Sequence, residues 1–166
     1  MTELEYLTVA DALALVLESV NVLGSETVPL AASLGRVLAT PVVSRDTLPP
    51  FANSSMDGFA IRAADVAAAS AETPVTLHVI GDIAAGSVPM QTVGQGEATR
   101  IMTGAPLPEG ADAVVPVEDT TVPWRYQTAE LPPTVGVLRP VKAGHSVRYP
   151  GEDISQGQEV LAAGCV

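Results

Sequence analysis

One short polar segment holds the residue types in this chain that can do chemistry. Two prolines interrupt regular structure, and the sequence Asn53-Ser54-Ser55-Met56-Asp57-Gly58 follows shortly after them. A single carboxylate in such a segment can bind a metal ion or orient a polar ligand. Gly58 permits a positive φ angle or the close approach of a ligand to the backbone. The alternative is a turn in which the side chains of Asn53 and Asp57 bond to their own backbone.

A second segment has the same arrangement. The sequence Arg100-Ile101-Met102-Thr103-Gly104 ends a strand-like run with a hydroxyl beside a glycine, and Pro106 and Pro108 follow it. Exposed amides and a threonine hydroxyl at such a turn can form a small anion-binding site. The alternative is a simple turn in which the Thr103 hydroxyl bonds its own backbone. A third segment, residues 148–154, also places charged residues around a glycine turn.

Together these segments resemble the N-terminal portion of the molybdopterin molybdenumtransferase family, which includes the bacterial MoeA proteins and the related domain of gephyrin. The matching text is NSSMDGFA from Asn53, RIMTGAP from Arg100 and GEDI from Gly151. Upstream, LGRVLA from Leu34 resembles the entry segment of the family. Each motif alone is weakly specific, but four of them in this order and spacing are highly specific. The resemblance extends from about Thr8 to the end of the chain.

Family members insert molybdate into adenylated molybdopterin, a polyanionic substrate, with the help of Mg²⁺. The resemblance implies a catalytic role for Asp57, as a Mg²⁺ ligand or in orienting the substrate, and a catalytic, substrate-contacting role for Thr103. It also implies a homodimer, in which this region of one subunit faces a pterin-binding domain that lies further downstream in the other. We therefore expect the chain to be part of a longer protein. The substrate-binding residues implied are Ser54, Ser55, Gly58, Arg100 and Gly104.

The third segment matches the family less closely. Tyr149 and Pro150 stand where family members often carry basic residues, so it stays open whether the loop at Arg148 contacts an anion. Glu152 and Asp153 match a family motif. An acidic pair at a glycine turn is typical of a solvated turn or of a salt-bridge partner, so we predict a structural role for both.

Composition narrows the class of protein. The chain has 166 residues, 47% of them hydrophobic and 4% aromatic, with 14 glycines and 14 prolines. This favours a core of aliphatic side chains and many short strands joined by tight turns. The net charge is −11 and there is no basic run, which argues against a nucleic-acid partner.

The single cysteine excludes an internal disulfide, and no apolar run approaches the roughly 18–20 residues of a membrane span. We predict a cytoplasmic protein with no membrane partner.

The elements that must position the candidate residues begin with one helix. Residues 8–20 carry an N-capping Thr8 with Asp11 three residues later, and apolar residues recur at helical spacing. We predict an amphipathic helix that packs on the core, and a second, short helix at residues 31–39. After it the pattern changes to strands and turns. Strands are predicted at residues 41–44, 59–62, 75–80, 97–102, 113–117, 121–125, 135–141, 146–149 and 159–161.

The predicted fold class is α+β and mostly β, with an N-terminal helical segment and a compact inserted domain that is a barrel or a coiled sheet. Residues 46–142 form the inserted domain. Residues 1–45 and 143–166 form a discontinuous domain of helix and strands, a pairing that the resemblance implies. The alternative function is a non-catalytic docking or dimerisation module, because the chain has no His or Cys constellation. A nucleotide hydrolase is poorly supported, because no P-loop is present.

Overall fold

The computed structural model describes residues 7–122 and 130–166, and this part of the chain is mostly β-structure. It contains one α-helix, α1 (Val9–Glu18), and the short 3-10 helices η1 (Leu30–Ala32), η2 (Ala63–Val66) and η3 (Val117–Asp119). The predicted fold class is confirmed. The strands are β1 (Val42–Val43), β2 (Asn53–Ser54), β3 (Gly58–Ile61), β4 (Val75–Ile83), β5 (Glu97–Ile101), β6 (Ala113–Pro116), β7 (Thr134–Val137), β8 (Val147–Arg148) and β9 (Glu159–Leu161).

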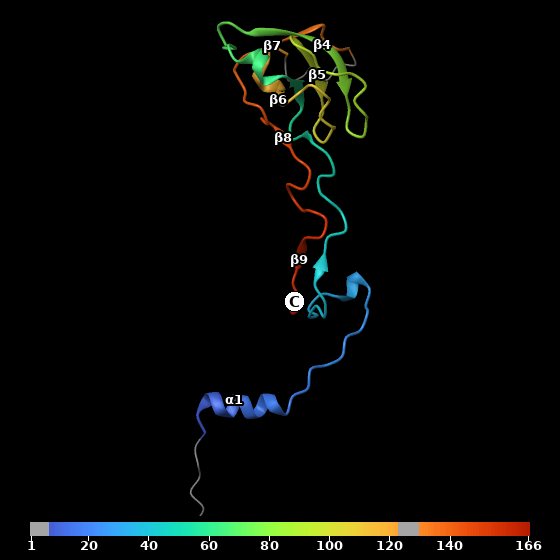
Figure 1. Ribbon diagram of the computed structural model, residues 1–166, viewed down its shortest axis with the longest axis vertical. Coiled ribbons are helices and arrows are strands. Elements are labelled where there is room, and N and C mark those ends of the chain that lie inside the picture. Colours follow the sequence, from blue (N-terminus) through green and yellow to red (C-terminus); the bar gives the residue numbers. More distant parts are fainter. Residues whose placement is uncertain (1–6, 123–129) are drawn as a thin grey trace, which may run out of the picture. The chain divides into compact units, whose positions relative to one another are not determined.

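Five of these strands form a curled, half-barrel sheet in the order β6-β3-β5-β4-β7 (Figure 1). All neighbouring strands are antiparallel except β4 and β5, which are parallel. In the centre of the sheet, Phe59 of β3 lies opposite Arg100 of β5 on one side and Val115 of β6 on the other. β4 continues to Ile83, three residues beyond the predicted end, because its last residues pair with the end of β5.

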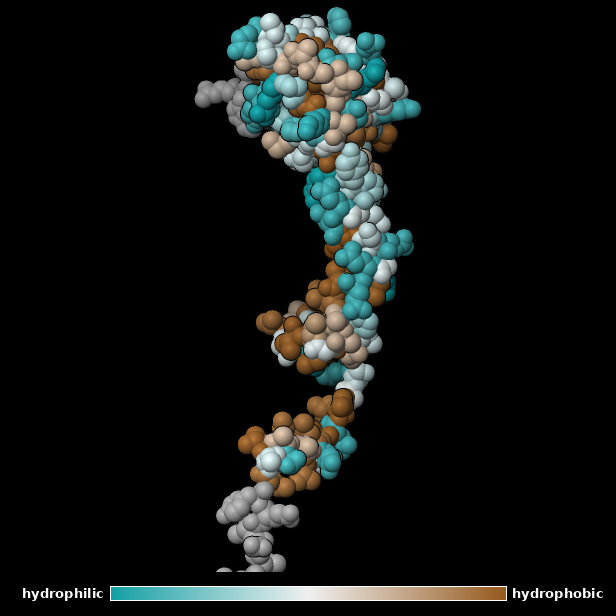
Figure 2. Space-filling model, turned by 60° about the vertical axis from the view of Figure 1, so that its left-hand side comes forward, coloured by the Kyte–Doolittle hydropathy of each residue, from teal (hydrophilic) through white to brown (hydrophobic). Residues whose placement is uncertain are grey.

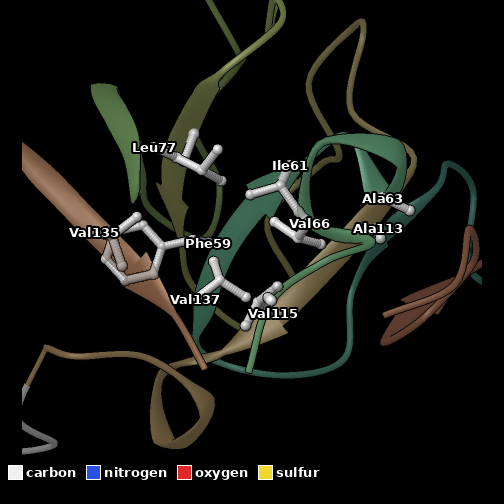
Figure 3. Packing of buried hydrophobic residues seen from close by; sticks show 11 residues of the cluster. Phe59, Ile61, Ala63, Val66, Leu77, Ala113, Val115, Val135 and Val137 are labelled. Atoms are coloured by element: carbon white, nitrogen blue, oxygen red, sulfur yellow. The ribbon is translucent and has the colours of Figure 1, made fainter. Parts of the chain in front are cut away.

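The sheet has an apolar cluster on each face, because successive strand residues point to opposite sides. Figure 3 shows the larger cluster, in which Phe59 and Ile61 of β3 pack among side chains from the other strands. Ala60, between them, belongs to the second cluster. Ala60, Ile101 and Ala105 of this smaller cluster belong to the first two motif segments. The buried members of the cluster are Ala60, Ile83, Ile101, Ala105, Val114 and Val147.

Two further sheets have two strands each, β1 with β9 and β2 with β8. By its internal contacts the chain divides into two compact units, residues up to Val42 with Leu161–Val166, and Val43–Val160. Within the first unit, the Leu38 amide donates to the Cys165 carbonyl and the Gly164 amide donates to the Leu38 carbonyl, both at 2.8 Å. The domain boundaries near residues 46 and 142 stay a prediction.

Helix α1 forms as predicted, but its predicted packing is wrong. The Thr8 hydroxyl accepts a hydrogen bond from the Asp11 amide at 3.2 Å, which confirms the N-cap. None of its residues is buried, and Val9 is 88% exposed. The apolar face, brown in Figure 2, is therefore not covered by the described residues of its own unit. No helix among the described residues is long and apolar enough to cross a membrane.

Two other predicted elements differ. The helix predicted at residues 31–39 is wrong, since only the single turn η1 forms there. Gly35, with a φ angle of 78°, takes a left-handed conformation that ends helical structure. Of the strand predicted at residues 121–125, Thr121 and Val122 lie in a bend, and the remaining residues lie outside those that the structure describes.

Candidate active site

The structure brings the three motif segments together around the short strand β2. On one edge of β2, Asn53 pairs with Arg148 of β8. On the other edge, the Ser54 amide donates to the Ala105 carbonyl at 3.0 Å and the Gly104 amide donates to the Ser54 carbonyl at 2.8 Å. Segments that lie far apart in the sequence are therefore hydrogen-bonded neighbours, and β2 is the strand that joins them.

Asp57 connects the first segment to the second. Its Oδ1 accepts hydrogen bonds from the Thr103 amide and from the Thr103 hydroxyl, both at 2.7 Å. Neither side chain therefore bonds its own backbone, as the turn alternatives would require. The second carboxylate oxygen, Oδ2, accepts no hydrogen bond from the residues that the structure describes, and the side chain is only partly buried. One oxygen thus fixes the carboxylate, and the other is open to a cation or a donor.

The serines of the first segment have different roles. Ser54 is 1% exposed, and its hydroxyl donates to the Met56 carbonyl at 2.6 Å and accepts from the Met56 amide at 3.2 Å. These local bonds of Ser54, which the sequence analysis did not predict, shape the loop that presents Asp57. The Ser55 amide donates to the Ser146 carbonyl at 3.0 Å, while its hydroxyl has no bonding partner among the described residues.

The two site glycines are needed for different reasons. Gly58 is buried and does not have a positive φ angle. A Cβ at Gly58 would lie 2.0 Å from the Val115 carbonyl oxygen, so the close approach is to β6. Gly104 is exposed and has a φ angle of 80°, with nothing within 4 Å of an added Cβ. Because the Gly104 amide is bonded to Ser54, it does not donate to a substrate in this conformation.

Arg100 is held by an acidic residue that the sequence did not reveal. Its Nε donates to Oδ1 of Asp82 at 2.9 Å and its Nη2 donates to Oδ2 at 2.7 Å. The hydrogen bonds from Arg100 hold the pKa of Asp82 below its ordinary value, against a smaller opposing effect of burial. Nothing in the spacing of Asp82 and Arg100 indicated the pair. It depends on the parallel pairing of β4 with β5.

We expect the Asp82→Asn variant to lose stability at neutral pH. A carboxyl whose pKa is lowered in the folded state stabilises that state above its unfolded pKa, and the contribution disappears as the pH falls through the folded pKa. The difference from wild type should be about 1 kcal/mol at pH 7, since the pair is partly exposed. It should begin to fall near the ordinary pKa of 3.8 and disappear only below the lowered pKa of the folded state. Urea unfolding between pH 7 and pH 3 tests this, with Glu72→Gln, at an exposed position, as the control.

The third segment is held by its own ion pair. Nη2 of Arg148 lies 2.9 and 2.7 Å from the two carboxylate oxygens of Asp153. The Tyr149 amide donates to the Glu152 carboxylate at 2.9 Å. The acidic residues thus act as a salt-bridge partner and a turn cap, as predicted. The unexpected feature is the position of Arg148, which the pairing of β8 with β2 places beside Asn53.

The carboxylates present can contribute to a magnesium site but cannot form one alone. Among the described residues, no three or more His, Cys, Asp or Glu side chains are grouped closely enough to hold a metal ion. Mg²⁺ is commonly held by one or two carboxylates, with substrate phosphates and water completing its shell. Asp57, with one open oxygen, fits that kind of site. Asp57 can therefore provide one protein ligand to a Mg²⁺ ion whose other ligands are phosphate oxygens of a substrate and water.

Thr103→Val should separate the roles of the hydroxyl and the turn. The variant keeps the shape of the side chain but removes one of the two hydrogen bonds to Asp57. In a longer protein that carries this chain, we expect substrate binding or the reaction at this site to weaken by about 1.5–3 kcal/mol, the range for a hydrogen bond to a charged group, while the fold is retained. Gly104→Val should be worse, because a β-branched residue is strained at a φ angle of 80°. Wild-type activity and substrate affinity in Thr103→Val would make this segment a structural turn.

Comparison with known proteins identifies the class of domain that the curled sheet and the three joined segments form. Residues 7–166 match the MoeA N-terminal region (domain I and II). The chain is 42% identical over 143 residues to a molybdopterin molybdenumtransferase of Synechococcus elongatus, covering 86% of this chain and 34% of that protein. It is 43% identical over 138 residues to molybdopterin molybdenumtransferase 2 of Mycobacterium tuberculosis, covering 83% of this chain and 32% of the relative. The chain belongs to the molybdopterin molybdenumtransferase family.

A solved structure supports this assignment. The crystal structure of a molybdopterin biosynthesis MoeA protein from Pyrococcus horikoshii superposes with a TM-score of 0.81 at 36% identity. The match covers 93% of this chain and 39% of that chain. The chain therefore spans about a third of the length of the curated relatives that it matches.

Proposed function

We propose that this chain supplies one wall of the active site of a molybdenumtransferase that inserts molybdate into adenylated molybdopterin. The observation that carries the proposal is the Asp57 carboxylate. One of its oxygens is fixed by two hydrogen bonds of 2.7 Å from Thr103, and the other is open. It lies where the three motif segments join, in a chain that belongs to this family.

In this proposal Asp57 uses its open oxygen to ligate Mg²⁺ or to orient the substrate. The Thr103 hydroxyl donates a hydrogen bond to Asp57 and so fixes the carboxylate, while its lone pairs can accept a hydrogen bond from the substrate. Ser55 offers a hydroxyl next to this pair in sequence. Since the chain has a net charge of −11, a polyanionic substrate needs a counter-charge. A bound Mg²⁺ would supply positive charge against the phosphate and molybdate oxygens.

We further propose that the active form is a cytoplasmic homodimer, in which the downstream pterin-binding domain of one subunit faces this region of the other. Two observations support it. The relatives are about three times as long as the matched region. The apolar face of α1, formed by Val9, Leu13, Val16 and Leu17, is more than half exposed at every position. A surface of that kind is typical of an interface with another domain or subunit.

We expect the isolated 166-residue chain to fold but not to transfer molybdenum, because it would hold only one wall of the site. The test mixes the chain with adenylated molybdopterin, molybdate and Mg²⁺ and measures molybdenum insertion. A full-length transferase that carries this chain as its N-terminal region is the positive control. Turnover by the isolated chain at a rate comparable to that control would contradict the shared-site proposal.

The alternative is a docking or dimerisation module without catalysis, which the exposed face of α1 also favours. The two functions differ in what they require of Asp57. A docking module depends on α1 and tolerates the loss of the carboxylate. The transferase needs Asp57 and, if the dimer proposal holds, α1 as well. Comparing Asp57→Asn with Leu13→Glu, for dimer formation by analytical ultracentrifugation and for transfer activity, therefore separates them.

A further inference from the structure

Asp82 and Arg100 form a two-pronged ion pair at the end of the strands that lead to the site. They lie directly opposite each other in the parallel register of β4 and β5. Both guanidinium bonds, at 2.9 and 2.7 Å, reach the same carboxylate. The Arg100 side chain is 14% exposed, so it is mostly withdrawn from solvent. A bidentate pair of this kind fixes orientation as well as distance. It therefore fixes the register of β4 against β5 at this end of the sheet.

A short series of contacts connects this pair to the site. β5 ends one residue after Arg100, and the Met102 amide then donates to the Ile83 carbonyl at 3.0 Å. Thr103 follows, and its amide and hydroxyl both reach Asp57. On the opposite edge of β5, Ile101 pairs with Gly58, the residue after Asp57. The direction in which Thr103 leaves the sheet is thus set by β4 on one side of β5 and by β3 on the other.

We propose that the Asp82–Arg100 pair is a positioning device that holds Thr103 against Asp57, and that Arg100 does not contact the substrate. Arg100 directs Nε and Nη2 at the Asp82 carboxylate, which neutralises its charge, and its side chain is mostly buried, so it is poorly placed to bind an approaching anion. The inference rests on the proposed function only in treating Asp57 and Thr103 as the site. The competing explanation is that the pair stabilises the whole sheet equally.

Amide hydrogen exchange, followed by NMR on the 166-residue chain, distinguishes local positioning from general stability. Asp82→Asn keeps the shape of the side chain and removes its charge. We expect the Thr103 amide to exchange well over tenfold faster in this variant, because its bond to Asp57 opens locally. The Ile61 amide in β3 should exchange no more than about fivefold faster, the factor that corresponds to the loss of about 1 kcal/mol in global stability. Asp82→Glu should retain most of the Thr103 protection. Arg139→Gln breaks the Asp119–Arg139 ion pair, which lies elsewhere in the same unit, and should leave Thr103 unchanged.

Two results would overturn the proposal. One is a folded Asp82→Asn protein in which Thr103 exchanges at the wild-type rate. The other is an equal loss of protection at Thr103 and Ile61, which would make the pair a general stabiliser of the sheet. If Asp82→Asn does not fold, the exchange of the Thr103 and Ile61 amides is compared in Arg100→Lys instead. Lysine keeps the positive charge but cannot form the bidentate pair. The exchange rates do not depend on transfer activity, so failure of the proposed function would leave this result standing.

Discussion

The Asp57→Asn variant of a full-length transferase that carries this chain should fold normally and lose at least about 100-fold in molybdenum insertion, the size of effect seen when a residue that stabilises developing charge is removed. The amide oxygen of asparagine can still accept the hydrogen bonds from the Thr103 amide and hydroxyl, so the link between the two segments is kept. What is lost is the negative charge and the open carboxylate oxygen. The rate is measured with adenylated molybdopterin and molybdate over a range of Mg²⁺ concentrations.

Asp57→Ala serves as the matched comparison. It removes the charge and also both hydrogen bonds, so it should lose activity and in addition about 1–3 kcal/mol of stability. If Asp57 only shapes the loop, the asparagine variant will be active and the alanine variant will lose stability alone. A normal insertion rate in folded Asp57→Asn protein would therefore exclude a role for this carboxylate in the reaction.

Gly58→Ala should have the largest effect on stability. A Cβ at this position would meet the Val115 carbonyl oxygen at 2.0 Å and the carbonyl carbon at 2.9 Å, and both are backbone atoms in the adjacent strand β6. The clash cannot be relieved by rotating a side chain, so the edge strand β6 must move away from β3. We expect a loss of about 3 kcal/mol or more in the free energy of unfolding, at the upper end of the range for overpacked cores. Thermal and urea denaturation measure it.

Gly24→Ala is the control for this substitution. Gly24 does not have a positive φ angle, and nothing lies within 4 Å of an added Cβ. The change should therefore leave stability within about 0.5 kcal/mol of wild type. Equal stability of Gly58→Ala and Gly24→Ala would show that β3 and β6 can separate without cost, contrary to the packing seen here.

Local patterns in the sequence predicted local structure well and predicted packing less well. The capped helix at Thr8 and the strands at β3, β5 and β6 follow from spacing and residue type alone. The helix at residues 31–39 was wrong because the left-handed Gly35 outweighs the helical preference of the flanking alanines and leucines. The core-facing role of α1 was wrong because amphipathic spacing shows that a face is apolar, and does not show what covers it.

In the candidate site, too, local features could be predicted from the sequence and contacts between distant segments could not. The motif residues could be identified in the sequence, but the bond between Asp57 and Thr103 could not, because it joins residues 46 positions apart. The partner of Arg100 could not be found either, since Asp82 reaches it only through a parallel strand pairing. Gly58 was expected at a ligand, and the structure instead packs it against the backbone of Val115. A glycine motif indicates a close approach without showing which atoms approach.

The position of β2 between two distant segments has a consequence for how the protein folds. Neither edge of β2 can pair until chain segments that are synthesised much later have been made and brought back to it. Closing such long loops costs entropy before any contact stabilises them, and contacts of this kind slow folding. The residues around Asp57 therefore cannot acquire their full arrangement before the segments at Ala105 and Val147 are present. A nascent chain that has not yet emerged as far as β8 lacks one edge of this arrangement.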